Sequence, residues 1–176
     1  MKKSLIDQLS QYAAYHRDRR NIATHFIGVP MIVLAVQTLL ARPGFELAGI
    51  ALSLATLATV ATAIYYLRLD LRFGLAMGLL LAVSLGFAQV CAAASTPLWL
   101  WTGLGLFVVG WAFQFVGHYF EGRKPAFVDD IVGLVVAPLF VLAELAFAIG
   151  LRPDVQHAIE ARAGAVKTGR AAAASR

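Results

Sequence analysis

Charged residues and cysteine are both scarce in this chain of 176 residues. Only 14% of the residues are charged, compared with about a quarter in an average soluble domain. The single cysteine, Cys91, leaves no pair for an intrachain disulfide framework and no cysteine cluster for a metal. Hydrophobic residues make up 60% of the chain, more than a soluble domain of this length can bury. These figures exclude a soluble enzyme, a secreted disulfide scaffold and a disordered chain.

Three long stretches of the chain contain no Asp, Glu, Lys or Arg. They cover residues 21–41, 47–67 and 73–120, and their lengths are 21, 21 and 48 residues. A helix needs about 20 apolar residues to cross a bilayer. A Ser-Thr-Pro turn at 95–97 divides the longest stretch. The pattern therefore predicts an all-α integral membrane protein with four transmembrane helices, over about 21–41, 47–67, 73–94 and 98–120.

A short amphipathic helix is expected before the first span. Side chains that recur at spacings of four, three and four residues fall on one face of a helix. In this chain they are Leu5, Leu9, Tyr12 and His16.

A fifth hydrophobic segment follows the fourth span. Residues 131–143 are only 13 uncharged residues long, with Pro138 inside the segment and Glu144 directly after it. A segment of this length is more often re-entrant or interfacial than spanning, so we expect a Pro-broken segment that does not cross. Residues 1–151 are then a single membrane-embedded domain, and residues 152–176 a polar basic tail that is partly disordered.

The basic residues indicate an orientation. If the N-terminus is cytoplasmic and four helices cross, 14 of the 15 basic residues lie on the cytoplasmic side and only Arg42 lies outside, as the positive-inside tendency requires. Both termini are then cytoplasmic, in the inner membrane of a bacterium or the endoplasmic reticulum of a eukaryote. The net charge of +5 favours anionic lipid head groups as partners over nucleic acid.

Three of the four histidines reach the same side of this predicted membrane. His16 precedes the first span, His25 lies in its first turns, and His118 ends the fourth span. Glu121 shares a helical face with His118. Two histidines and one carboxylate are typical of non-haem Fe(II) centres, and zinc accepts a similar set. We therefore expect a metal site at the cytoplasmic rim, and we interpret His157 as structural.

The spacing of the histidines adds a condition. His16 and His25 are nine residues apart, which places them about 180° from each other on a continuous helix. They can share a site only if the helix breaks between them, near residues 17–20.

Other polar residues accompany the histidines. Asn21 shares a face with His25, and Gln114 shares one with His118 and, at membrane depth, is expected to have a hydrogen-bond partner. Asp129 either supports the site or, with Asp130, caps the next helix. Glu144 interrupts an apolar segment and is a functional candidate with no evident partner.

Two motifs resemble the signatures of the Mpo1-like family. The first is His16-x4-Asn21-x3-His25-x2-Gly28-x-Pro30. The second is Trp111-x2-Gln114-x2-Gly117-His118-x2-Glu121-x3-Pro125-Ala126. The resemblance continues to about residue 151, although the middle spans match only in hydrophobicity.

The resemblance implies an integral-membrane, Fe(II)-dependent dioxygenase of fatty-acid α-oxidation. Such an enzyme uses O2 to cleave a long-chain 2-hydroxy fatty acid between C1 and C2, which gives CO2 and an acid one carbon shorter. His16, His25 and His118 then hold Fe2+, with Glu121 in a catalytic role. Candidates to attract the substrate carboxylate are Arg20, Arg123 and Lys124. Arg17 stands where some members carry a second adjacent histidine.

Two other functions remain open on the residues alone. His25 and His118 could be the axial ligands of a b-type haem held between two helices. Alternatively, the chain is a non-enzymatic transporter or membrane scaffold in which the histidines line an interface. The sequence indicates neither an oligomeric state nor the chain length of a substrate.

Overall fold

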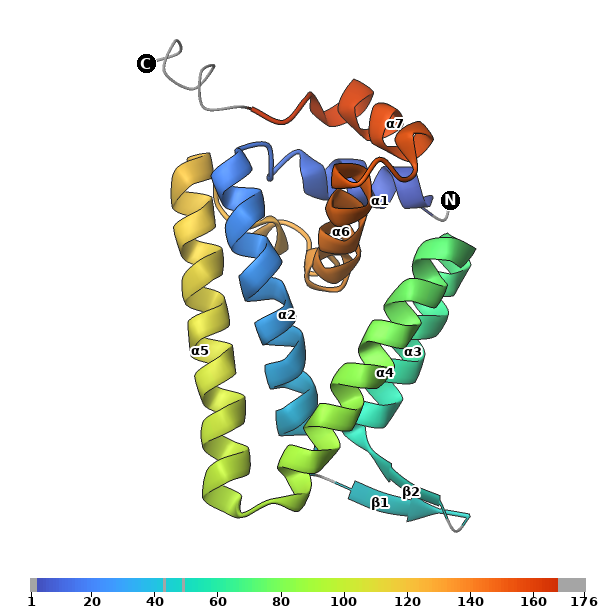
Figure 1. The fold of residues 1–176 in the computed structure, drawn as a ribbon, viewed down its shortest axis with the longest axis vertical. Helices are drawn as coiled ribbons and strands as arrows, with labels where there is room; N and C mark the ends of the chain where they lie inside the picture. The colour runs from blue at the N-terminus through green and yellow to red at the C-terminus, as the bar shows by residue number, and fades with distance from the viewer. Residues whose placement is uncertain (1–2, 43, 49, 168–176) are drawn as a thin grey trace. The chain divides into compact units, whose positions relative to one another are not determined.

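The computed structural model describes residues 3–42, 44–48 and 50–167, and this part of the chain is almost entirely helical (Figure 1). In chain order the elements are α1 (Leu5–Ala13), α2 (Arg19–Ala41), β1 (Gly44–Leu47), β2 (Ile50–Ser53), α3 (Leu54–Leu69), α4 (Leu71–Ala93), α5 (Thr96–Glu121), the short 3-10 helix η1 (Ala126–Val128), α6 (Gly133–Ala148) and α7 (Pro153–Ala163). The chain divides into two compact units. Unit 1 is Met1–Val29 with Ala112–Arg176, and unit 2 is Pro30–Trp111.

Three to four helices in the described residues are candidate membrane spans. α2, α4 and α5 are each long and apolar enough to cross. α6 and α7 together form a further candidate, bent by 116° at the break between them. Most exposed side chains of α4 are apolar, with Val83 67% and Val90 73% exposed, as suits a helix in contact with lipid. The predicted helical membrane class is confirmed at this level.

The second predicted span begins too early. Leu47 ends the strand β1 and residues 50–53 form β2, and these strands pair antiparallel from Gly44 opposite Ser53 to Leu47 opposite Ile50. The Ser53 side chain accepts a hydrogen bond from the Thr56 N–H and caps α3. An uncharged apolar run does not distinguish strand from helix. α3 is consequently 16 residues long, or about 24 Å, which is less than the roughly 30 Å hydrocarbon core.

The fifth hydrophobic segment does not break at its proline. Pro138 lies inside α6, and the helix continues past it to Ala148. The helix instead ends at Ala148, and in the break that follows Gly150 and Arg152 have φ of 78° and 54°. Left-handed backbone terminates a helix, and glycine adopts it without strain.

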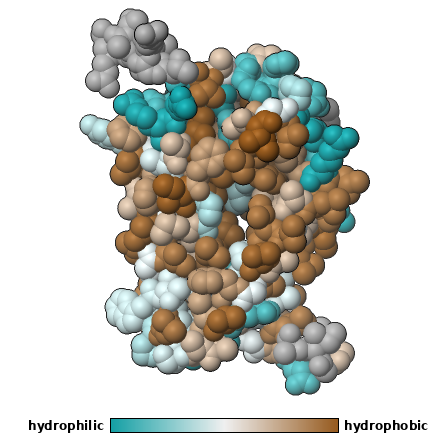
Figure 2. Space-filling view, viewed as in Figure 1, coloured by the Kyte–Doolittle hydropathy of each residue, from teal (hydrophilic) through white to brown (hydrophobic). Residues whose placement is uncertain are grey.

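α1 and the C-terminal helix both belong to unit 1. The Ser4 side chain accepts from Asp7 N–H while the Asp7 carboxylate accepts from Ser4 N–H, so a capping box starts α1. α1 packs on α6 and α7, and hydrophilic side chains gather over α1 and α7 (Figure 2). The tail predicted over 152–176 therefore contains a helix, while its residues 168–176 lie outside the described part.

Unit 2 has a polar network inside its apolar helices. Gln37 of α2 donates to the Thr59 hydroxyl of α3 at 2.7 Å and to the Leu81 carbonyl of α4 at 3.2 Å. Ser84 of α4 donates to the Gln37 side-chain oxygen at 2.5 Å. Hydrogen bonds of this kind hold helices together where lipid removes the hydrophobic drive for association.

We predict that a side chain at Gly74 separates α3 from α4. A Cβ there would lie 2.6 Å from the backbone N and Cα of Leu67, so Gly74→Val is expected to destabilise the protein by about 1–3 kcal/mol through overpacking. Gly78→Val is the matched control on the same helix, because no atom lies within 4 Å of its Cβ position. Thermal unfolding in detergent measures both variants, and equal midpoints would contradict the prediction.

Candidate metal centre

Three buried histidines of unit 1 meet at one point. His16 lies in the linker between α1 and α2, His25 lies on α2, and His118 lies near the end of α5. Their exposed fractions are 0%, 1% and 6%. Each offers a ring nitrogen, and these nitrogens all lie within 4.8 Å of one another. The structure therefore brings together the three histidines that the sequence places at one level of the membrane.

The hydrogen bonds of His16 and His25 fix which nitrogens face the centre. His16 Nδ1 lies 2.7 Å from the Tyr12 carbonyl, and His25 Nδ1 lies 2.9 Å from the Asn21 carbonyl. A carbonyl oxygen only accepts, so each Nδ1 carries the proton and each Nε2 of the neutral ring presents a lone pair. Histidines that bind metals characteristically donate their other N–H to such a carbonyl.

The two lone pairs face each other. His16 Nε2 and His25 Nε2 are 3.1 Å apart, a distance at which two acceptors repel unless a cation or a proton lies between them. Burial lowers the pKa of His16 well below its usual value, which disfavours a proton held there as an imidazolium. The donor set therefore fits a metal ion that takes neutral imidazole ligands.

The linker between α1 and α2 makes this meeting possible. α1 ends at Ala13, α2 begins at Arg19, and His16 N–H donates to the Ala13 carbonyl at 2.9 Å. The predicted break between His16 and His25 is present, and it begins slightly earlier than expected. The ring of Tyr12 stacks on the His16 ring with centroids 4.1 Å apart, so α1 fixes the plane of His16.

Glu121 binds the linker through its carboxylate. Its Oε2 accepts from Arg17 N–H at 2.9 Å, from Asp18 N–H at 2.7 Å and from the Asn21 side-chain amide at 3.0 Å. Glu121 follows His118 by three residues on α5, so it ties the helix of one histidine to the linker of another. A catalytic role for this carboxylate remains a prediction.

The supporting residues have different surroundings. Asn21 contacts the site directly through its carbonyl, the acceptor for His25. Gln114 is buried, and its Nε2 has no hydrogen-bond partner among the described residues, although a partner was expected. Asp129 accepts from the Tyr15 hydroxyl at 2.8 Å and from Lys124 at 2.6 Å. Asp130 accepts from the N–H of Val132, the residue before α6, at 3.0 Å, and no side chain caps the first turn of α6.

The three candidate carboxylate-binding residues all have protein partners. Arg20 pairs with Asp18 at 2.8 Å and lies over the Phe120 ring. Arg123 donates to the Ala14 carbonyl at 2.9 Å, and Lys124 pairs with Asp129. All three side chains are exposed, and each of these bonds directs a cation to the surface of unit 1.

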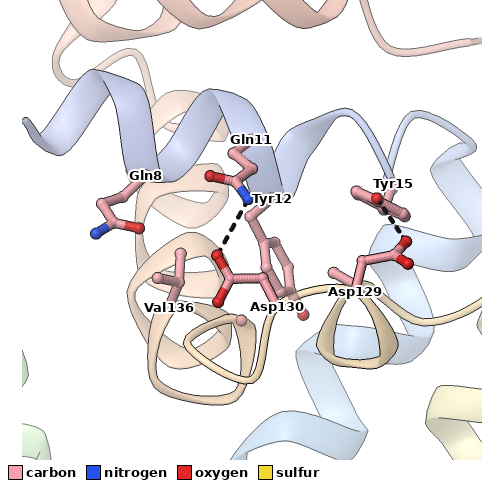
Figure 3. Close-up of a pocket in the computed structure, with 9 residues that line it drawn as sticks. Gln8, Gln11, Tyr12, Tyr15, Asp129, Asp130 and Val136 are labelled. Atoms are coloured by element: carbon pink, nitrogen blue, oxygen red, sulfur yellow. Dashed lines mark hydrogen bonds between the residues drawn. The ribbon is translucent and has the colours of Figure 1, made fainter. Parts of the chain in front are cut away.

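A small pocket lies between α1 and the segment that leads into α6 (Figure 3). Asp129 and Asp130 line it opposite Gln11, Tyr12 and Tyr15. Its volume of about 20 Å³ is room for little more than one water molecule. None of the three histidines lines this pocket, and an acyl chain does not fit in it.

Sequence reasoning missed the partner of Glu144. Glu144 of α6 accepts from the Arg17 guanidinium at 3.2 Å, and both side chains are largely buried. Glu144 stood out as the single acid in an apolar segment. Its partner lies 127 residues away, and no local spacing indicates such a pair.

The fold and the site together define a predominantly helical protein with candidate membrane spans and a buried site of three histidines. The model of the family described as "2-hydroxy-palmitic acid dioxygenase Mpo1-like" matches residues 2–149, and the chain belongs to this family. It is 36% identical over 165 residues to a Saccharomyces cerevisiae protein named 2-hydroxy-palmitic acid dioxygenase MPO1, a match that covers 91% of each chain. No solved structure is significantly similar to this chain.

We predict that Gly117→Ala disrupts the histidine cluster. A Cβ at this position would overlap the side-chain oxygens of Thr24 and Asn21 and lie 3.3 Å from His25 Nδ1. Either the side chains of Thr24 and Asn21 then leave their hydrogen bonds or α5 moves away from α2. Both changes disturb the surroundings of His25, at a cost of about 1–3 kcal/mol and with loss of bound metal. Gly105→Ala, also on α5, has no atom within 4 Å of its Cβ position and is the control. Metal content and thermal unfolding measure both, and a Gly117→Ala protein that matches the control would refute the prediction.

A second prediction concerns Glu121. Because its Oε2 accepts three hydrogen bonds, Glu121→Gln is expected to lower the stability of the metal-free protein by about 1.5–3 kcal/mol, the usual worth of a hydrogen bond to a charged group. Asp154→Asn is the control, since Asp154 is exposed and pairs only weakly with Arg152 at 3.5 Å. An unchanged thermal midpoint in Glu121→Gln would show that the carboxylate does not hold the linker.

Proposed function

We propose that this protein is an iron-dependent dioxygenase that cleaves long-chain 2-hydroxy fatty acids between C1 and C2. The observation that carries the proposal is the buried trio of His16, His25 and His118, two of which direct unprotonated nitrogens at each other across 3.1 Å. The name of the yeast relative, 36% identical over nearly the whole chain, supports the substrate class and the reaction type.

The three imidazole donors limit which metal ions the site would bind. Imidazole ligands suit zinc, copper, iron and nickel. Zinc has no redox chemistry, so the oxidation that the relative's name describes favours a redox-active ion, and we propose Fe2+. When bound, the iron would supply Lewis-acid binding of the substrate's hydroxyl and carboxylate and electron transfer to O2.

The proposed reaction balances without another reductant. A 2-hydroxy acid, R–CH(OH)–COOH, and O2 give R–COOH, CO2 and H2O. The C1–C2 bond breaks, and the substrate loses four electrons, which reduce O2 completely. No 2-oxoglutarate is needed, because the substrate itself is the electron donor.

The residues of this chain would bind the metal and the substrate, orient the histidine rings and exclude water from the site. The Tyr12 and Asn21 carbonyls keep the protons of His16 and His25 on Nδ1 and hold the ring planes. The acyl chain would lie among apolar side chains of the helices, and the carboxyl group would lie at the histidines. We also propose Glu121 as a catalytic group, Arg20, Arg123 and Lys124 as an attractive field for the carboxylate, and a cytoplasmic placement of the site.

The test uses purified full-length protein. We expect it to contain iron and to consume 2-hydroxypalmitate and O2 in equal amounts, with formation of an acid one carbon shorter, whereas palmitate without the hydroxyl is not consumed. Chelation should abolish turnover, and added Fe2+ should restore it. His25→Ala and His118→Ala are each expected to reduce turnover by more than about 100-fold, beyond the loss caused by a residue that only orients a ligand.

His157→Ala is the matched control, because His157 is exposed on α7 and should leave turnover unchanged. Full activity of His118→Ala would remove that histidine from the site. A Soret band in the purified protein would replace the proposal with a b-type haem protein. A protein that binds no metal under anaerobic conditions would indicate a transporter or scaffold.

A further inference from the structure

Arg17 directly follows the candidate ligand His16 and is 5% exposed. All three nitrogens of its guanidinium bond to protein acceptors. Nε donates to the carbonyls of Ala13 and His16, each at 2.9 Å. The terminal nitrogens donate to the Gly164 carbonyl at 3.0 Å and to the Glu144 carboxylate at 3.2 Å. This arginine is therefore held inside the protein and does not extend to a surface.

The bond to the His16 carbonyl has a specific consequence. His16 lies just beyond the end of α1, so its carbonyl is not bonded within a helix. Its N–H donates to Ala13, and its carbonyl accepts from Arg17. Both peptide groups of the residue are thus bonded, and the path of the chain through His16 is determined by these two contacts together with the Tyr12 ring.

Glu144 keeps the arginine in place. A buried guanidinium without a counter-charge is strongly unfavourable, and Glu144 supplies this charge from α6. The pair therefore fastens the linker to α6, while Glu121 fastens the same linker to α5 through the N–H groups of Arg17 and Asp18. The segment after α7 adds a third attachment, because Lys167 N–H donates to the Arg17 carbonyl at 2.7 Å.

We propose that Arg17, held by Glu144, is a positioning residue that sets His16 against His25 and His118 for metal binding. The proposal rests on the metal site of the proposed function, but not on iron or on the fatty-acid reaction. If it is correct, the affinity of the site for a divalent cation depends on the hydrogen bonds of the Arg17 guanidinium as well as on the three imidazoles.

Two variants separate positioning from stability. Arg17→Met with Glu144→Leu replaces the buried pair by apolar groups of similar size, an exchange that commonly preserves or raises stability. Arg17→Lys keeps the charge, but a single ammonium cannot bond to the Ala13 and His16 carbonyls and Glu144 with the geometry of a guanidinium. Arg162→Gln is the control, since Arg162 forms an exposed pair with Asp7 at 2.6 Å between α7 and α1 away from the histidines.

The readout is cobalt(II) titration of metal-free full-length protein, followed by its visible absorption, with thermal unfolding of the same samples. We expect the dissociation constant to rise by about 10–100-fold in the double variant and in Arg17→Lys, as for residues that orient metal ligands. The double variant should unfold near the wild-type temperature, and Arg162→Gln should bind cobalt as the wild type does.

Wild-type cobalt affinity in Arg17→Lys, or in a stably folded double variant, would overturn the proposal, and so would a wild-type protein that binds no cobalt. A wild type that binds cobalt but turns over no 2-hydroxy acid would refute the proposed function alone. Weakened binding in the two Arg17 variants would still establish the positioning role in that case.

Discussion

The backbone of the linker between α1 and α2 must be hydrogen-bonded although it is not helical, and the rest of unit 1 is arranged around this requirement. Buried peptide groups without partners are strongly unfavourable. Side chains supply most of the partners. The Glu121 carboxylate accepts from two linker N–H groups, and the Arg17 guanidinium donates to the carbonyls of Ala13 and His16. The remaining carbonyls are bound by the side chains of Asn21 and Arg123 and by the Lys167 N–H. The same linker carries His16, so the bonds that satisfy it also locate a candidate ligand.

This arrangement explains why buried and partly buried charges of the described residues gather at the linker that carries His16. Glu121, Arg17 and Glu144 come from α5, the linker and α6, and each contributes to holding the linker. A helix does not need such groups, because its peptide groups bond to one another. The polar residues are therefore concentrated where the helical pattern stops, which is also where the linker, α2 and α5 present the three histidines.

The convergence of the histidines was predictable because it depends on topology. His25 and His118 lie at helix ends that the uncharged runs define, and the 180° offset of His16 requires a break. The partner of Glu144 was not predictable, since contacts between residues 127 positions apart leave no periodic trace. The hairpin at 44–53 was missed for a different reason. An uncharged run carries no sign of backbone conformation, and the only local signal was Ser53 as a helix cap.

The charges around the site favour an anionic substrate. The candidate ligands His16, His25 and His118 would contribute neutral imidazoles, and the charges of Arg17 and Glu144 cancel each other. Glu121 is then the charged group on α5 closest in sequence to His118, and its Oε2 is already bonded to the linker. A divalent cation at the histidines would carry two positive charges into a site of low dielectric, where uncompensated charge is unfavourable. The Glu121 carboxylate and the carboxylate of an acid substrate would together balance those two positive charges. An alcohol or ester substrate would leave one positive charge uncompensated. If the proposed function holds, we therefore expect the protein to prefer the free acid over an alcohol or ester.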